Sequence, residues 1–226
     1  MKRAIFFLLS LTLFSLSMEI QAGIVIGHTR VIYDGNKKEA SVSIVNPKKS
    51  SVYLIQSWVD SGKTNEKSPF IVTPPLFRIN PGDENILRII YIGDKLPQDR
   101  ESVFWLNIKS IPAIDDTTER VNQLQIVMKS RIKLFYRPKG LDEKLETPWS
   151  QLHFSHNGNR LLVINPTCYY ITLFSLKVDG IDIKDVDMIP PKGQVSFILP
   201  SISASSITWQ AINDYGGISK IEKINL

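Results

Sequence analysis

The stretch VNQLQIVMKSRIKLFYRP, residues 121–138, decides the fold of the chain. Leu124, Ile126 and Met128 alternate with mostly polar residues, so they share one face of a predicted half-buried strand. Residues 123–136 contain no glycine or proline, and this length exceeds the usual strand of about five or six residues. The pattern alone leaves two interpretations open: a long core strand, or an overhanging edge that is kept for a partner.

Residues 1–22 predict a secretory signal peptide. A basic start is followed by an apolar run at residues 4–16, which is short for a membrane span of about 20 residues, and Ala22 is the small residue expected before a cleavage site. Glu19 interrupts the run early, which makes an uncleaved anchor the weaker alternative. The mature chain is therefore expected to be exported, with no stable insertion in the membrane.

The charge and the cysteine content exclude two classes of protein. The 27 basic and 22 acidic residues are interspersed, so the small positive excess forms no stripe of the kind that binds nucleic acid. We therefore expect no nucleic-acid partner. Cys168 is the single cysteine, so no internal disulfide can form, and apolar cores must hold the fold together.

Short β segments alternate with turn signals between residues 23 and 140. Seven such segments, the first at residues 24–34, favour an immunoglobulin-like sandwich whose seventh strand is the stretch quoted above. Trp58 lies near the end of one segment, and its ring is expected to fill the sandwich core. Pro74 and Pro75 interrupt another segment, which is therefore expected at a sheet edge or where the chain changes sheets, since a central strand needs the ladder donors that proline lacks.

A second, smaller β domain is predicted at residues 143–226. Asn157-Gly158 and Asp179-Gly180 are turn signals between strand-like residues, so each predicts a hairpin. A charged run at residues 141–148 is expected to connect this domain to the first one, which spans residues 23–142. The fold class is thus all-β with two domains.

Residues suited to catalysis or metal binding are few. His153 and His156 lie three apart on a predicted strand, so their side chains point to opposite faces and are not expected to share a metal. Cys168 is expected to be a packed thiol, and Asp115 and Asp116 a solvated loop. The sequence holds no nucleotide-binding or hydrolase motif, so we expect neither an enzyme nor a cofactor or metal.

Two basic residues in apolar strands are candidates for an anion site. Arg30 and Lys133 would each be costly to bury without an anionic partner, although either side chain could instead reach solvent at a sheet edge. In a regular strand, Lys133 faces away from Leu124, Ile126 and Met128. Alternation alone therefore does not join the lysine and the apolar face into one site.

The chain resembles the PapD-like periplasmic chaperones of the chaperone–usher pathway, which help to assemble adhesive pili in Gram-negative bacteria. The matching segments, in the family's order, are TRVIYDG (29–35), VTPPLFRI (72–79), PGDENILRI (81–89), LPQDRESVFWLNIKSIP (96–112), LQIVMKSRIKLFYRP (124–138), NPTCYYITL (165–173) and INDYGG (212–217). The short connection at residues 115–122 resembles the short-loop subgroup. Cys168 stands where relatives commonly carry a proline.

This resemblance implies two immunoglobulin-like domains in a boomerang and a non-enzymatic periplasmic chaperone. Such a chaperone binds, folds and caps pilus subunits by donor-strand complementation and delivers them to an outer-membrane usher. Leu124, Ile126 and Met128 would be the side chains lent to the subunit's groove. Arg30 and Lys133 would hold the subunit's C-terminal carboxylate.

Further roles are implied for other positions. An interdomain charge network would join Glu101, Arg137 and Asp214. Contacts with the usher would fall near Leu54, Gln56, Thr73, Pro74 and Pro75. A dimer that caps its own donor strand is one state of the chaperone that the sequence leaves open.

The rival function is a secreted two-domain adhesin or carbohydrate-binding module. That class calls for aromatic residues clustered at loop tips. Trp58, Trp105, Trp149 and Trp209 instead lie in strand-like segments or beside the domain junction.

Overall fold

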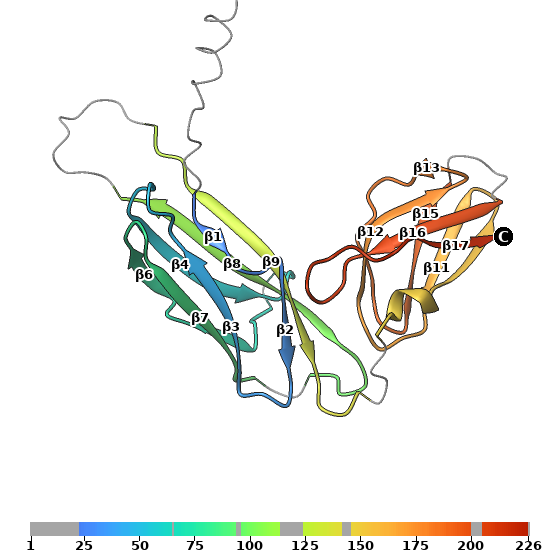
Figure 1. Ribbon diagram of the computed structural model, residues 1–226. Helices are drawn as coiled ribbons and strands as arrows, with labels where there is room; N and C mark the ends of the chain where they lie inside the picture. The colour runs from blue at the N-terminus through green and yellow to red at the C-terminus, as the bar shows by residue number, and fades with distance from the viewer. Residues whose placement is uncertain are drawn as a thin grey trace, which may run out of the picture.

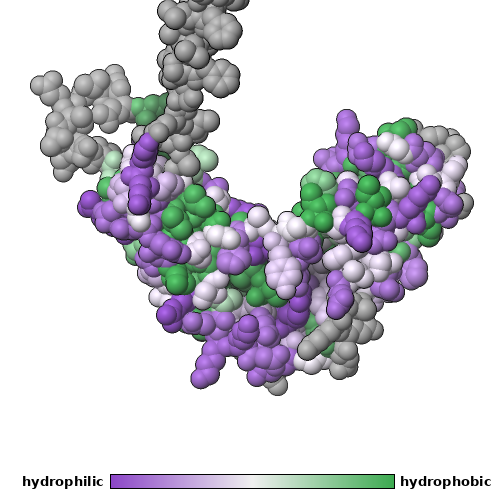
Figure 2. Space-filling model, in the orientation of Figure 1, coloured by the Kyte–Doolittle hydropathy of each residue, from purple (hydrophilic) through white to green (hydrophobic). Residues whose placement is uncertain are grey.

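The computed structural model describes residues 23–64, 66–93, 96–113, 124–141, 146–199 and 205–225. The predicted signal peptide, the 115–122 connection and part of the predicted linker lie outside the described residues. Figure 1 shows two β domains set at an angle, and Figure 2 shows a notch between them with hydrophobic side chains on the surface of both lobes. Within the described ranges, no helix is long and apolar enough to cross a membrane.

The first domain is a sandwich of two sheets. One sheet has the order β1 (Val25–Ile26), β3 (Glu39–Val45), β7 (Glu84–Tyr91) and β5 (Phe70–Thr73). The other has the order β2 (Arg30–Asp34), β9 (Met128–Arg137), β8 (Ser102–Pro112), β4 (Tyr53–Asp60) and β6 (Leu76–Ile79). Strands β2 and β9 pair in parallel, whereas the other pairs described in this domain are antiparallel.

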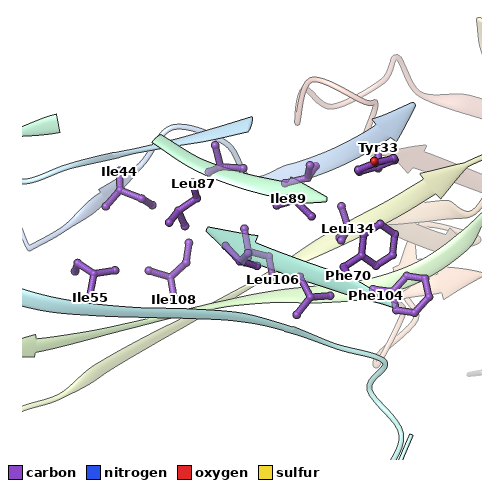
Figure 3. Close-up of a cluster of buried hydrophobic side chains, with 14 of the residues drawn as sticks. Tyr33, Ile44, Ile55, Phe70, Leu87, Ile89, Phe104, Leu106, Ile108 and Leu134 are labelled. Carbon is purple, nitrogen blue, oxygen red and sulfur yellow. The ribbon is translucent and has the colours of Figure 1, made fainter. Parts of the chain in front are cut away.

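The core of this domain lies between the two sheets. Figure 3 shows Ile44, Leu87 and Ile89 from one sheet opposite Ile55, Leu106 and Ile108 from the other, and all six side chains are buried. Each strand contributes alternate residues, because successive side chains of a strand point to opposite faces.

Two of the predicted segments are each divided between the sheets, so seven predicted segments become nine strands. Residues 24–34 are not one strand: β1 and β2 belong to different sheets, and Gly27 lies between them. The N–H of Gly27 donates to the carbonyl oxygen of Ser43 (2.9 Å), and a Cβ atom on Gly27 would lie 2.2 Å from Ser43 Oγ, so a side chain there would have to displace the serine hydroxyl. The predicted change of sheet at Pro74 and Pro75 is confirmed, since β5 and β6 belong to different sheets.

Trp58 does not fill the core, contrary to the prediction. Ile55, Ser57 and Val59 are the inward residues of β4, and Trp58 lies on its outer face. There Lys129 Nζ lies 5.2 Å from the centre of the indole ring. The error arises because the core side of a strand is set by the sheet that packs on it, not by the largest side chain.

The second domain is also built from β-sheets and has a separate core. One sheet has the order β10 (His153–Asn157), β11 (Arg160–Asn165) and β15 (Gly193–Ile198). The other has the order β13 (Ile181–Asp182), β12 (Ile171–Val178), β16 (Ser206–Ala211) and β17 (Glu222–Asn225), with β14 (Met188–Ile189) also paired to β12. A short 3-10 helix, η1 (Pro148–Gln151), precedes them. Both predicted hairpins are confirmed, as β10–β11 and β12–β13.

Candidate functional site

Strand β9 has one open edge. From Lys133 to Tyr136 it lies between β2 and β8, whereas from Met128 to Ile132 only β8 pairs with it among the described strands. The main-chain groups on the other side of this half are therefore available to a further strand. An exposed edge of this kind can bind an extended segment of another chain by adding it to the sheet.

The apolar end of this edge is exposed. The exposed fractions are 89% for Leu124, 62% for Ile126 and 63% for Met128. Residues 124–127 are not part of a described strand, so the prediction that Leu124 and Ile126 lie in a half-buried strand is wrong for the isolated chain. Of the two interpretations, the exposure agrees with an overhanging edge and not with a long core strand. The ladder between β8 and β9 ends at the pair of Ser110 and Met128, although β8 continues to Pro112. Beyond that pair, Gln125 Nε2 donates to the carbonyl oxygen of Pro112 (2.7 Å).

The two faces of β9 have different environments. Its register with β8 is regular from Met128 to Tyr136, so Met128 continues the face on which Leu134 and Tyr136 enter the core. Lys129 and Lys133 project from the opposite face. Met128 and the candidate anchor lysine are therefore on opposite faces of one strand, as alternation predicts.

Arg30 and Lys133 are neighbours on paired strands. They are register partners in the parallel β2–β9 ladder, which no local sequence pattern could reveal. Arg30 is only 8% exposed, its Nη1 donates to the carbonyl oxygen of Ile212 (3.1 Å), and its guanidinium lies 5.6 Å from the centre of the Phe135 ring. Burial lowers the pKa of Arg30, although the charges of Asp214 and Glu101 oppose that shift.

Lys133 is bound to a residue that the sequence reasoning missed. Its Nζ donates to Oδ1 of Asp187, which lies in the second domain just before β14. The exposed fractions of the two side chains are 22% for Lys133 and 68% for Asp187. Nothing in the local sequence distinguishes Asp187 from other surface aspartates, because the pairing depends on how the two domains meet.

The structure brings together the three residues of the expected interdomain network. Arg137 Nε and Nη2 each lie 2.8 Å from Oε1 of Glu101, and Nη1 donates to Oδ2 of Asp214 at 2.9 Å. The other oxygen of Glu101 accepts from the backbone N–H of Tyr170 (2.8 Å). Arg137 also packs on the ring of Tyr169, with 4.8 Å between its guanidinium carbon and the ring centre.

Burial and the neighbouring charges act in opposite directions on the pKa values of Glu101 and Arg137. The side chain of Glu101 is 2% exposed, and its burial raises the pKa of the carboxyl, an effect that the charge of Arg137 opposes. Burial would lower the pKa of Arg137, but the hydrogen bonds and charges of Asp214 and Glu101 outweigh it and raise that pKa. Arg137 therefore stays charged, and Glu101 depends on it as its main counter-charge.

The loop between β16 and β17 makes several of the contacts between the two domains. Figure 1 shows it reaching toward β2 and β9. It presents the carbonyl of Ile212 to Arg30 and the carboxylate of Asp214 to Arg137, and Gly216 lies so close to Thr29 that a Cβ atom would be 2.2 Å from its hydroxyl oxygen. A cavity of about 410 Å³ lies at this junction, lined by Arg30 and Phe135 on one side and by residues 211–215 on the other.

The residues expected to contact the usher also lie together. Leu54 and Gln56 are on the outer face of β4, whose pairing with β6 places them beside the bend at Pro74 and Pro75. Ser57 fixes this bend, since its N–H and Oγ donate to the carbonyl oxygens of Pro75 (2.9 Å) and Pro74 (3.0 Å).

The remaining candidates for chemistry lie apart from this site or are buried beside it. Cys168 is buried beside the junction, where its carbonyl oxygen accepts from the N–H of Glu101 (2.9 Å). His153 and His156 are exposed on β10. Within the described ranges, no group of histidine, cysteine, aspartate and glutamate side chains is arranged to hold a metal ion.

A further feature that the sequence reasoning missed is the outer face of β8 and β9. Arg131 lies over the ring of Trp105, with 4.6 Å between its guanidinium carbon and the ring centre, and binds Asp60 at 2.8 Å. Asn107 also donates to Asp60 (2.6 Å). Burial would raise the pKa of Asp60, but these hydrogen bonds outweigh it and lower the pKa below its ordinary value.

Comparisons with known proteins agree in both domains. The family described as pili and flagellar-assembly chaperone, PapD N-terminal domain, matches residues 23–142, and the family described as pili assembly chaperone PapD, C-terminal domain, matches residues 147–223. The probable fimbrial chaperone LpfB of Escherichia coli O157:H7 is 45% identical over 98% of this chain and 96% of its own length. The chaperone protein LpfB of Salmonella typhimurium is 43% identical over 86% of this chain and 85% of its own.

Solved structures show the same architecture. A chain from the Salmonella enterica SafA pilin in complex with the SafB chaperone matches with a TM-score of 0.81 and 31% identity. The match covers 93% of this chain and 99% of that chain.

Proposed function

Because the chain belongs to the PapD family of pilus assembly chaperones, we propose that it binds, folds and caps fimbrial subunits by donor-strand complementation and delivers them to an outer-membrane usher. The first domain, residues 23–142, supplies the donor strand, and residues 143–226 form the second wall of the site. The mechanism requires no catalytic residue, cofactor or metal. The chain acts in the periplasm after removal of residues 1–22.

The observation that carries this proposal is the open half of β9. Its main-chain groups pair with β8 on one side and with no described strand on the other, which supplies ladder bonds that do not depend on the partner's side chains. Leu124, Ile126 and Met128 are exposed at this end of the edge. An incomplete subunit sandwich would cover these side chains and order residues 124–127 as a strand.

Arg30 and Lys133 fix the end of the bound segment. They are adjacent in register where the open half of β9 gives way to the half covered by β2, so a subunit strand that runs along the edge ends beside them. Its terminal carboxylate would accept charge-assisted hydrogen bonds worth about 1.5 to 3 kcal/mol each. The carboxylate thereby sets the register of the subunit strand on β9.

Co-expression with candidate fimbrial subunits tests the proposal. A subunit is expected to co-purify with the wild-type chain from the periplasm and to be degraded or aggregated without it. Ile126→Glu and Met128→Glu are expected to abolish the complex, because each would bury a carboxylate in the subunit's apolar groove. Ile198→Glu is the matched control, since Ile198 is 72% exposed on β15 of the other domain. Complexes that survive both donor-face substitutions would contradict the assignment.

A further inference from the structure

The ammonium group of Lys133 already holds a carboxylate, and that carboxylate belongs to the chain itself. Lys133 Nζ donates to Oδ1 of Asp187 across the domain junction. This is the same chemistry that a subunit's C-terminus would present to Lys133. Asp187 therefore occupies a position that a bound subunit needs.

The side chain of Asp187 can rotate away from Lys133 without a change in the backbone. Its carbonyl oxygen accepts from the N–H of Leu173 (2.8 Å), and the next residue, Met188, is paired with Thr172. These bonds fix the main chain of residue 187, whereas its side chain is 68% exposed. Rotation of the side chain would release Lys133 with the second domain in place.

Arg30 supplies a second, independent sign of an unfilled anion site. The residue is 8% exposed, and its Nε is buried and makes no hydrogen bond within the described part of the chain. Its Nη1 is bound to a neutral carbonyl oxygen, that of Ile212, and not to a carboxylate. The nearby carboxylates of Glu101 and Asp214 are bound to Arg137. Of these two adjacent cations, Lys133 is hydrogen-bonded to a carboxylate, that of Asp187, whereas no hydrogen bond from Arg30 to a carboxylate is described.

We propose that Asp187 is a placeholder for the subunit's terminal carboxylate, which displaces it from Lys133 when the subunit binds. This inference rests on the proposed function and adds to it a step that selects for partners that also pair with β9. A tethered carboxylate competes with a free one for Lys133, so a free carboxylate binds more weakly than it would without Asp187. A subunit that also pairs with the edge of β9 has the additional binding energy to complete the exchange.

The exchange can be tested without any subunit, by acetate titration of the chain. The probe is the side-chain NMR signal of Lys133, which is assigned as the signal that is absent from the Lys133→Arg variant. A titration with sodium chloride at equal ionic strength serves as the reference. Because exposed ion pairs are weak, Asp187→Asn is expected to lower the acetate concentration at half-saturation by about twofold to fivefold. Asp182→Asn is the matched control, since Asp182 pairs with Lys177 (3.3 Å) at a similar exposure of 70% on the same domain. If the acetate concentration at half-saturation is the same for the wild type, Asp187→Asn and Asp182→Asn, the proposed role of Asp187 is overturned.

A second measurement uses a fimbrial subunit that co-purifies with the wild-type chain. Asp187→Asn is expected to tighten its binding by about twofold to fivefold for the native C-terminus, with no gain for the same subunit carrying a C-terminal amide. Equal or weaker binding of the native subunit would refute the inference. If no subunit binds the wild-type chain at all, the proposed function fails, while the acetate titration still decides whether Asp187 competes for Lys133.

Discussion

Replacing Arg137 by methionine removes the counter-charge of a buried carboxylate while keeping much of the apolar stem. Glu101 would then be left with the backbone N–H of Tyr170 as its described donor, in a site where its side chain is 2% exposed. Removal of one member of a buried ion pair costs about 3 to 5 kcal/mol. We expect the lower part of this range, because the side chain of Arg137 is 27% exposed and its second partner, Asp214, is 47% exposed.

The loss should depend on pH, because Glu101 can escape its unpaired charge by binding a proton. Burial already raises its pKa above the ordinary value of 4.5, and loss of Arg137 raises it further. A carboxyl whose pKa is higher in the folded state gives stability that is complete below the unfolded pKa and is lost as the pH rises through the folded pKa. The destabilisation by Arg137→Met should therefore be largest above neutral pH and decrease as the pH falls toward 4.5.

The assay is urea unfolding followed by circular dichroism at pH 7.5 and at pH 5, with the thermal midpoint as a second measure. Arg88→Met is the matched control. Arg88 pairs with Glu39 at 3.4 Å on the surface, so its loss should cost less than about 1 kcal/mol. Adding Glu101→Gln to Arg137→Met should recover stability, since the double variant buries no charge at position 101. The reasoning is refuted if Arg137→Met costs no more than Arg88→Met, or if Glu101→Gln adds to the loss.

Three further outcomes are expected. Gly216→Val should lower thermal stability by more than Gly158→Ala and change the interdomain angle measured by small-angle scattering. Both glycines have positive φ, but a Cβ atom meets the hydroxyl of Thr29 only at Gly216. Lys133→Ala should leave the thermal midpoint within about 2 °C of wild type, since its ion pair is partly exposed, yet prevent recovery of a subunit complex. The lowered pKa of Asp60 should add stability that is complete above its ordinary pKa of 3.8 and is lost as the pH falls through the pKa of the folded state. Asp60→Asn should therefore make the free energy of unfolding less dependent on pH at the acid end.

The local features of the fold were accessible from the sequence. Strand positions follow from alternation of apolar residues, and the hairpins at Asn157-Gly158 and Asp179-Gly180 follow from turn chemistry, because both depend on residues close together in the chain. The division of residues 24–34 into two strands was not accessible. It results from a crossing between sheets that depends on the close approach of Gly27 to β3.

The sequence by itself determined the all-β class, the two-domain length, the apolar stripe of Leu124, Ile126 and Met128, and the presence of basic residues in apolar strands. Resemblance to a family supplied the roles. Only the tertiary structure decided that β2 covers one edge of the long stretch from Lys133 onward and leaves the edge open from Met128 to Ile132, since that depends on where β2 begins.

Only the tertiary structure, too, placed Arg30 beside Lys133 and set Asp187 on the lysine. A parallel ladder between the second strand and the last strand of a domain, and an ion pair between domains, join residues far apart in the sequence. Their energies arise when the sheets and the domains pack together, and no short pattern of residues encodes them.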